Sequence, residues 1–147
     1  MGQGITNPAE PFFKDGQWGW DGTLWRKLPI VWGYSDRYAE VETALDVAAG
    51  DPILTFSTVP EGEIWVIQSL VGRSYQANVT SIRLVAVTAA VDVTLKEDVP
   101  AAALRTVDWS GALVLKKDDH LEARFYGCLL HDNVYAEVWG YKMKVAE

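Results

Sequence analysis

The sequence predicts an all-β protein: an antiparallel β-sandwich or barrel preceded by an extended N-terminal arm. From Tyr38 onward, apolar and polar residues alternate with a period of two in short runs. Turn-forming residues separate these runs regularly, and no long helical pattern alternates with them as it would in a parallel sheet. The 147 residues, of which 49% are apolar and 22% charged, suit a single globular domain.

Residues 1–36 form the expected arm. Glycines recur there from Gly2 to Gly33, and prolines from Pro8 to Pro29, and both residue types interrupt helices and long strands. The best strand candidate within the arm is residues 23–32. We therefore divide the chain into an extended N-terminal arm, 1–36, and a β-sandwich domain, 37–147.

The sandwich domain contains the remaining expected strands. They are rich in β-branched and aromatic residues and are separated by Gly, Pro, Asp and Asn. In chain order they are residues 38–48, 53–59, 64–72, 79–89, 91–99, 112–117, 120–127 and 133–145. Residues 100–109 are instead a short helix candidate, because Asp98 can cap a helix and Pro100 suits its first turn.

Alternation assigns the faces of the first and last strands. Residues 38–48 place Val41 and Leu45 on one side and the paired carboxylates Glu40 and Glu42 on the other, which indicates a half-buried strand with the glutamates on a solvent face. In residues 133–145 one side is apolar and the other is amphipathic. The amphipathic side carries the residues of a possible ligand face: Tyr135, Trp139 and Tyr141.

Charge and hydropathy exclude two classes of partner. The 13 basic and 20 acidic residues give a net charge of −7, the wrong sign for a surface that neutralises phosphates, so no nucleic-acid partner is expected. The longest apolar run, around residues 84–91, is far shorter than the roughly 20 residues that span a bilayer, so no membrane partner is expected. The single cysteine, Cys128, is expected to be buried.

The sequence predicts no catalytic site, no metal site and no cofactor. Two short acidic turns carry the histidines: Asp118 and Asp119 precede His120, and Asp132 follows His131. Such clusters are typical of tight β-turns, whose Asp side chains bond the local backbone, and they lack the spacing of calcium or zinc motifs. No nucleophile motif accompanies either histidine. We therefore expect a protein that is not an enzyme.

Tryptophan is the most informative residue type. Four of the seven tryptophans lie within residues 16–36, whereas Trp65 lies in the most apolar strand and is expected in the core. Aromatic and arginine side chains are the usual anchors of protein interfaces. The arm is therefore expected to bind a neighbouring chain through Trp18, Trp20, Trp25, Arg26, Trp32 and Tyr34. Trp18 and Trp20 are the best candidates, whereas Trp25 and Trp32 would belong to the core if the arm packs on the sandwich.

Two stretches resemble proteins of tailed-bacteriophage virions. The arm sequence "WDGTLWRKLPIVWG" resembles a D-G-T-x-W-R-K-L phrase near the start of such proteins. The stretches "VPEGEIWVIQSL" and "GALVLKKDDHLEARFYGCLLHDNVYAEVWGYKM" are similar to jelly-roll modules of phage particles. This chain departs from the pattern at Asp118-Asp119, where many such modules have Gly-Asp.

The resemblance implies a jelly-roll-like sandwich and a non-enzymatic virion structural protein, such as a capsid decoration or cement protein. Its partners would be other virion proteins, namely the major capsid protein or neighbouring subunits, and it would form a homo-oligomer. It would lie on the outer surface of the virion, and in the host cytoplasm during assembly. Net negative charge suits a position away from packaged DNA.

Two other functions remain as alternatives. The first is a carbohydrate-binding β-sandwich in which Tyr135, Trp139 and Tyr141 stack on sugar rings. The second is a small enzyme that uses His120 and His131. Polysaccharide binding would distinguish the first alternative, and loss of an activity on changing either histidine would distinguish the second.

Overall fold

The computed structural model describes residues 18–20, 25–27, 36–75, 79–100 and 106–145. Within these residues it is built from strands and turns without a helix, and so holds no apolar helix able to cross a bilayer. The strands are β1 (Trp18–Trp20), β2 (Trp25–Lys27), β3 (Asp36–Val47), β4 (Ile53–Thr55), β5 (Glu63–Ser74), β6 (Ser81–Thr88), β7 (Val91–Asp98), β8 (Thr106–Leu115), β9 (His120–Tyr126) and β10 (Asp132–Lys144).

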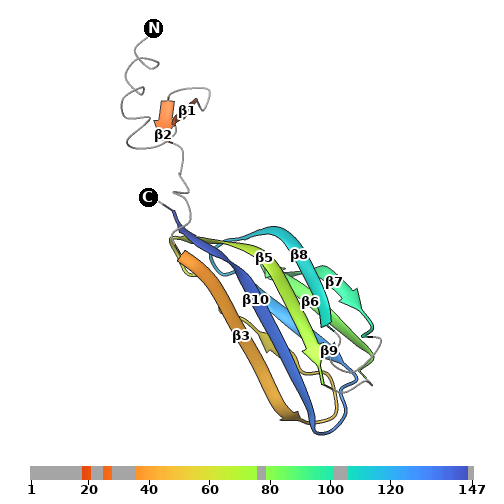
Figure 1. Cartoon of the computed structure of the whole chain (residues 1–147). Coiled ribbons are helices and arrows are strands. Elements are labelled where there is room, and N and C mark those ends of the chain that lie inside the picture. Colours follow the sequence, from red (N-terminus) through yellow and green to blue (C-terminus); the bar gives the residue numbers. More distant parts are fainter. Residues whose placement is uncertain (1–17, 21–24, 28–35, 76–78, 101–105, 146–147) are drawn as a thin grey trace.

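Strands β3 to β10 form two packed four-stranded antiparallel sheets (Figure 1). The first has the order β3-β10-β5-β8 and the second the order β4-β9-β6-β7. Apart from the β6–β7 hairpin, every consecutive pair of strands crosses from one sheet to the other. This path, with eight strands in two sheets, is that of a jelly roll. The prediction of an all-β, jelly-roll-like sandwich is confirmed.

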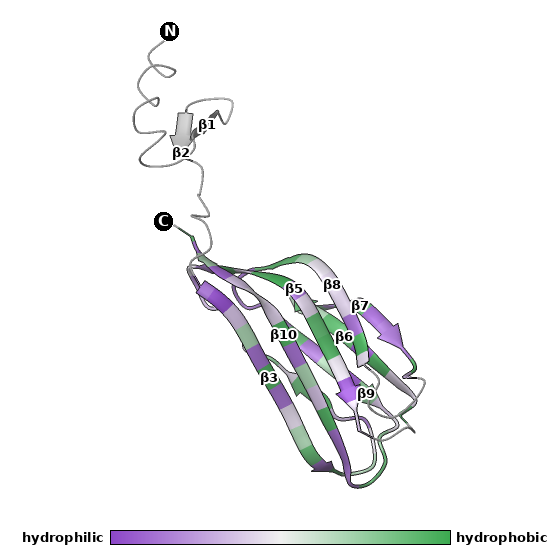
Figure 2. Cartoon of the chain, viewed as in Figure 1, coloured by the Kyte–Doolittle hydropathy of each residue, from purple (hydrophilic) through white to green (hydrophobic). Residues whose placement is uncertain are grey.

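The core lies between the sheets, where inward-facing residues of both are almost fully buried. Trp65 is 3% exposed and its ring lies 4.3 Å from that of Tyr38, centroid to centroid. Cys128 is also buried and carries a free thiol. The core predictions for Trp65 and Cys128 are therefore confirmed. Along the strands, hydrophobic and hydrophilic residues form alternating bands (Figure 2).

The predicted faces of β3 are reversed. Val41 and Leu45, expected to face the core, are 54% and 73% exposed, whereas Glu40 and Glu42 lie on the half-buried side toward the second sheet. The physical reason is Tyr38, which stacks on Trp65 in the core. Because side chains alternate, the inward position of Tyr38 sends the even-numbered residues that follow it inward as well.

The prediction of a helix at residues 100–109 is wrong for residues 106–109, which the structure describes as part of a strand. Thr106 begins β8, a strand that pairs with β5 along its length, with Val107 opposite Gly72 and Trp109 opposite Leu70. Val107 is buried and Trp109 packs against the core. The local helix propensity is therefore overridden by pairing and burial. Residues 101–105 lie outside the described residues.

Two other predicted strands are longer than the observed ones. The expected strand 53–59 ends at Thr55, although Phe56 and Val59 remain buried beyond it. Within the arm, β1 and β2 form a two-stranded antiparallel sheet of their own in which Trp20 pairs with Trp25. This is shorter than the expected strand 23–32, of which residues 23–24 and 28–32 lie outside the described residues.

Candidate functional site

The outer face of the first sheet carries the predicted ligand residues. Tyr135, Trp139 and Tyr141 project from the same side of β10, while Val134 and Val138 on the other side are at most 1% exposed. Trp139 is 44% exposed, which is high for an indole in the middle of a sheet. The structure thus brings these three aromatic residues together on one surface.

Small side chains surround Trp139 across the strands. It lies opposite Ala39 on β3 and Ser69 on β5, and Ser69 in turn lies opposite Ser110 on β8. A bulge in β5 next to Ser69 shifts the register of both its neighbours there. Trp139 therefore has a small residue directly opposite it on each neighbouring strand. The Arg37 guanidinium lies 5.9 Å from the ring centroid.

A second aromatic group lies farther along the same face. The Arg73 guanidinium is 4.9 Å from the ring centroid of Tyr135 and 5.2 Å from that of Tyr75. The Tyr135 hydroxyl donates a 2.5 Å hydrogen bond to Glu137 Oε2, which raises the pKa of Tyr135. Tyr135 is therefore held in one orientation by charged groups on both sides, and it keeps its proton at neutral pH.

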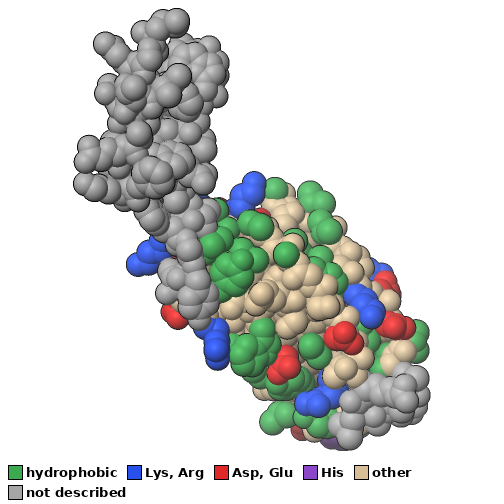
Figure 3. All heavy atoms as spheres, turned by 45° about the horizontal axis from the view of Figure 1, so that its top comes forward, with side chains coloured by type: hydrophobic (Ala, Val, Ile, Leu, Met, Phe, Trp, Pro, Cys, Tyr) green, Lys and Arg blue, Asp and Glu red, His purple; other side chains and the backbone are tan. Residues whose placement is uncertain are grey.

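An apolar strip on β3 borders these aromatic groups. Val41 lies opposite Glu137, and Leu45 follows four residues along the same side. Hydrophobic side chains lie among Lys, Arg, Asp and Glu over the surface visible in Figure 3. Exposed Trp and Tyr rings with stacked arginines and an apolar margin are the composition of protein-binding hot spots. We use the name aromatic face for the surface formed by the outward-facing, odd-numbered residues of β3 (37–45) and β10 (135–141), together with Arg73 and Tyr75.

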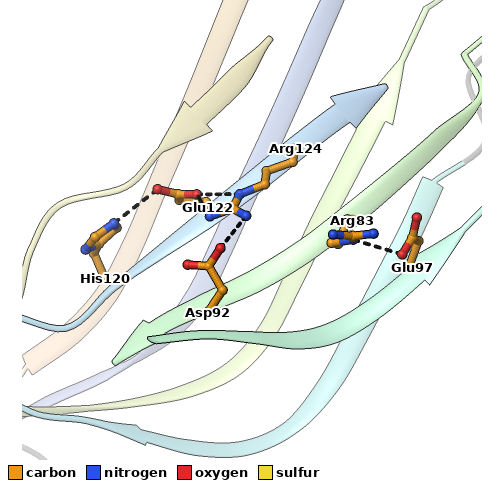
Figure 4. A network of polar contacts seen from close by, with 6 residues as sticks. All are labelled: Arg83, Asp92, Glu97, His120, Glu122 and Arg124. Atoms are coloured by element: carbon orange, nitrogen blue, oxygen red, sulfur yellow. Dashed lines mark hydrogen bonds and ion pairs between the residues drawn. The ribbon is translucent and has the colours of Figure 1, made fainter. Parts of the chain in front are cut away.

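The outer face of the second sheet differs, because its charges are paired with one another (Figure 4). Arg124 binds Glu122 at 2.6 Å and Asp92 at 2.5 Å, and its hydrogen bond to Asp92 lowers the pKa of that carboxyl. Arg83 binds Glu97 at 2.8 Å. A face on which opposite charges already satisfy each other offers few unpaired groups for a ligand.

The two histidines do not form a joint site. His120 lies on β9 and contacts Glu122 at 3.2 Å, whereas His131 lies in the loop before β10 and contacts Asp46. Asp118 adopts a left-handed turn conformation, and Asp119 accepts hydrogen bonds from the backbone of Lys116 and Ala89. The turn interpretation of the Asp118-Asp119 pair is confirmed. No group of three potential metal ligands occurs among the described residues.

The predicted arm interface is described only in part. Trp18 and Trp20 lie on β1, and Trp25 and Arg26 on β2. Trp32 and Tyr34 lie outside the described residues. Sequence reasoning missed the apolar strip on β3 and the arginines that stack on the aromatic face, because alternation within one strand does not reveal which cross-strand neighbours it meets.

No protein-family model matches the sequence, and no curated protein is similar to it in sequence. Among solved structures, a capsid chain of cyanophage Pam1 is 13% identical with a TM-score of 0.48, covering 84% of this chain and 96% of that one. A chain of the virus-like particle of the extra small virus of the giant freshwater prawn Macrobrachium rosenbergii is 10% identical with a TM-score of 0.37, covering 89% of this chain and 96% of that one. A family 29 carbohydrate-binding module in complex with cellulohexaose is 10% identical with a TM-score of 0.36, covering 75% and 80%.

The strand order defines the class of the molecule, an antiparallel two-sheet β-sandwich of the jelly-roll kind. What distinguishes this chain within that class is the aromatic face on one sheet and the paired charges on the other. The first is a surface with rings available for contact, whereas the second is already satisfied within the chain.

Proposed function

We propose that this protein is a non-enzymatic structural component of a bacteriophage virion, a capsid decoration or cement protein that binds neighbouring subunits. The observation that carries the proposal is the aromatic face, where Trp139 is 44% exposed beside the exposed Val41. Burying such rings, each with about 150–250 Å² of surface, is an efficient source of binding energy between subunits. The tryptophan-rich arm supplies a second contact region of the same chemistry.

Association of the full chain tests this proposal. Tyr135→Ala together with Trp139→Ala removes two rings from the aromatic face, and we expect at least a tenfold weaker self-association or particle binding. A matched control exists on the other sheet, where Tyr126 also has an arginine over its ring, Arg83 at 5.3 Å. Tyr126→Ala should leave association unchanged. Equal effects of both variants, or absence of the protein from purified particles, would refute the proposal.

Carbohydrate binding is the second candidate function. The observation that favours it is the 44% exposure of Trp139 between small residues on both neighbouring strands, because an exposed indole can stack on a flat sugar ring. Titration of tryptophan fluorescence with neutral and acidic polysaccharides tests this candidate. Saturable quenching that Trp139→Ala abolishes would favour a sugar ligand, and no quenching at millimolar sugar would leave protein association as the function of this face.

A further inference from the structure

Strand β3 is an open edge of the first sheet. It runs for 12 residues without a proline and pairs with β10 on one side only. Within the part of the chain that the structure describes, no strand pairs with its other side. A long edge of this kind presents a row of unpaired backbone groups, to which an additional strand can bind.

The two sides of β3 differ chemically. The outer side carries Val41 in the apolar strip, and the inner side carries Glu40 and Glu42. Glu40 accepts hydrogen bonds from Ser57 N at 2.9 Å and from the Tyr38 hydroxyl at 2.8 Å. Neither glutamate forms a salt bridge with a basic side chain in the described ranges. An added strand therefore meets apolar surface on one side and carboxylates on the other.

A second copy of β3 fits this edge poorly. An antiparallel partner centred on residue 40, 41 or 42 would place Glu40 or Glu42 opposite the same glutamates of the other copy. Like charges directly opposite each other in a sheet are destabilising. The edge therefore selects against pairing with itself and favours a strand that carries a cation.

Strand β2 of the arm has the required pattern. It is Trp25-Arg26-Lys27 and has β1 on one side as its only sheet partner among the described residues. When a Trp-Arg-Lys segment is added to a sheet as a strand, its side chains alternate between the two faces, so Trp25 and Arg26 would face opposite sides. Seated on the edge of β3, this pattern matches Arg26 to the Glu40–Glu42 side and Trp25 to the Val41 side.

We propose that β2 of one copy adds to the free edge of β3 in a neighbouring copy, with Arg26 facing Glu42. This deepens the proposed function, on which it rests, by naming the surface that receives the arm. The partner is a second copy of this chain, because its arm contains a strand with the basic and aromatic residues that suit the β3 edge. Such addition is head-to-tail: each contact joins two unlike surfaces, the arm of one copy and the β3 edge of the next.

A charge exchange between copies tests the proposal on the full chain. Arg26→Glu brings two carboxylates together at the contact, and Glu42→Lys brings two cations together, so each variant alone should lose assembly at least tenfold. In a 1:1 mixture, each arm meets an edge of opposite charge on the other variant, so the mixture should regain assembly. Native mass spectrometry would show species that contain both variants.

Several results would overturn the proposal. One is a wild-type chain that stays monomeric at high micromolar concentration, and another is unchanged assembly in either single variant. A third is a 1:1 mixture of the single variants that stays monomeric, together with a double variant R26E/E42K that assembles or melts like the wild type. This pair of results would place the contact between Arg26 and Glu42 within one chain. Asp108→Lys, which exchanges a carboxylate on the opposite edge strand β8, is the matched control and should assemble normally.

The readouts separate this proposal from the proposed function. Circular dichroism melting confirms that each variant is folded before its assembly is scored. If both charge variants assemble normally while the variant without Tyr135 and Trp139 does not, the edge proposal fails and the aromatic face stands. If all variants bind particles like the wild type, both proposals fail.

Discussion

Glu42 illustrates how the fold changes the chemistry of a single residue. Sequence alternation predicts it on a solvent face, but the structure places it on the half-buried side of β3 beside Glu40. Partial burial and the neighbouring carboxyl group raise the pKa of Glu42. A carboxyl whose pKa is higher in the folded than in the unfolded state stabilises folding only as it takes up its proton, so this contribution grows as pH falls.

The first prediction concerns this carboxyl. Glu42→Gln removes the unfavourable charge, so we expect the variant to be more stable than the wild type at neutral pH. The advantage should shrink as pH falls through the raised pKa toward the ordinary value of 4.5, where both states of the wild type become protonated. Urea unfolding of both proteins across this pH range measures the difference. A constant difference, or a wild type that is more stable at neutral pH, would contradict it.

Gly140 is a residue whose identity is set by close packing. A Cβ atom there would lie 2.1 Å from the backbone oxygen of Val66, in the middle of the pairing between β10 and β5. Gly140→Ala should therefore reduce the free energy of unfolding by about 2 to 3 kcal/mol, because the backbone must shift. Gly62→Ala is the control. Its Cβ meets nothing within 4 Å, and its φ of +79° alone should cost about 1 kcal/mol.

At the scale of elements, the β6–β7 hairpin contains an unusual turn. Two residues, Ala89 and Ala90, connect Thr88 to its partner Val91, and their φ angles are +48° and +62°. Two positive φ angles in a two-residue hairpin indicate a type I′ turn, which strongly prefers Asn-Gly. Alanine has no side-chain group that compensates for the left-handed conformation, so this turn is strained.

The hairpin gives a prediction of increased stability. Replacing Ala89 by Asn and Ala90 by Gly keeps the turn geometry and removes the strain, so we expect a gain of about 1 to 2 kcal/mol. The backbone of residue 89 still donates to Asp119 Oδ1 in the variant, as it does at 3.3 Å in the wild type. Guanidinium unfolding measures the gain. A lower midpoint with an unchanged slope would show that the alanine methyl groups contribute packing that outweighs the strain.

The elements also show what sequence patterns can predict. The strands around Trp65 and those at 120–126 and 132–144 were predictable because their alternation is strong and their turns are marked by Gly, Asp and Asn. The start of β8 was not, because a short alanine-rich run preceding Trp109 has helix propensity that only pairing with β5 overrides. The faces of β3 were reversed because both its sides carry apolar residues, and only the stacking of Tyr38 on Trp65 selects one of them.

At the scale of the whole molecule, the sequence predicted the aromatic residues of the candidate site but not the residues that neighbouring strands add to it. The side of β10 that carries Tyr135 and Trp139 follows from alternation within one strand. The contribution of Arg73, and the apolar strip beside it, depends on which strands become neighbours in the jelly roll. Such long-range pairing leaves no local signal. The proposals made here rest on two surfaces that such pairing leaves without a partner among the described residues, namely the aromatic face and the edge of β3.

The last prediction separates the proposed binding role of the arm from the stability of the sandwich. Trp65 belongs to the core of the sandwich and is 3% exposed. If the arm binds a neighbouring chain, as we propose, Trp18→Ala with Trp20→Ala should leave the melting temperature unchanged while assembly is lost. Trp65→Ala is the contrast, because emptying a buried indole site should cost about 3 to 5 kcal/mol. Thermal melting and sedimentation velocity on the same samples measure both properties. If the melting temperature of the arm variant were as low as that of Trp65→Ala, its tryptophans would belong to the core of their own chain. The arm would then not be a segment that binds a neighbouring chain.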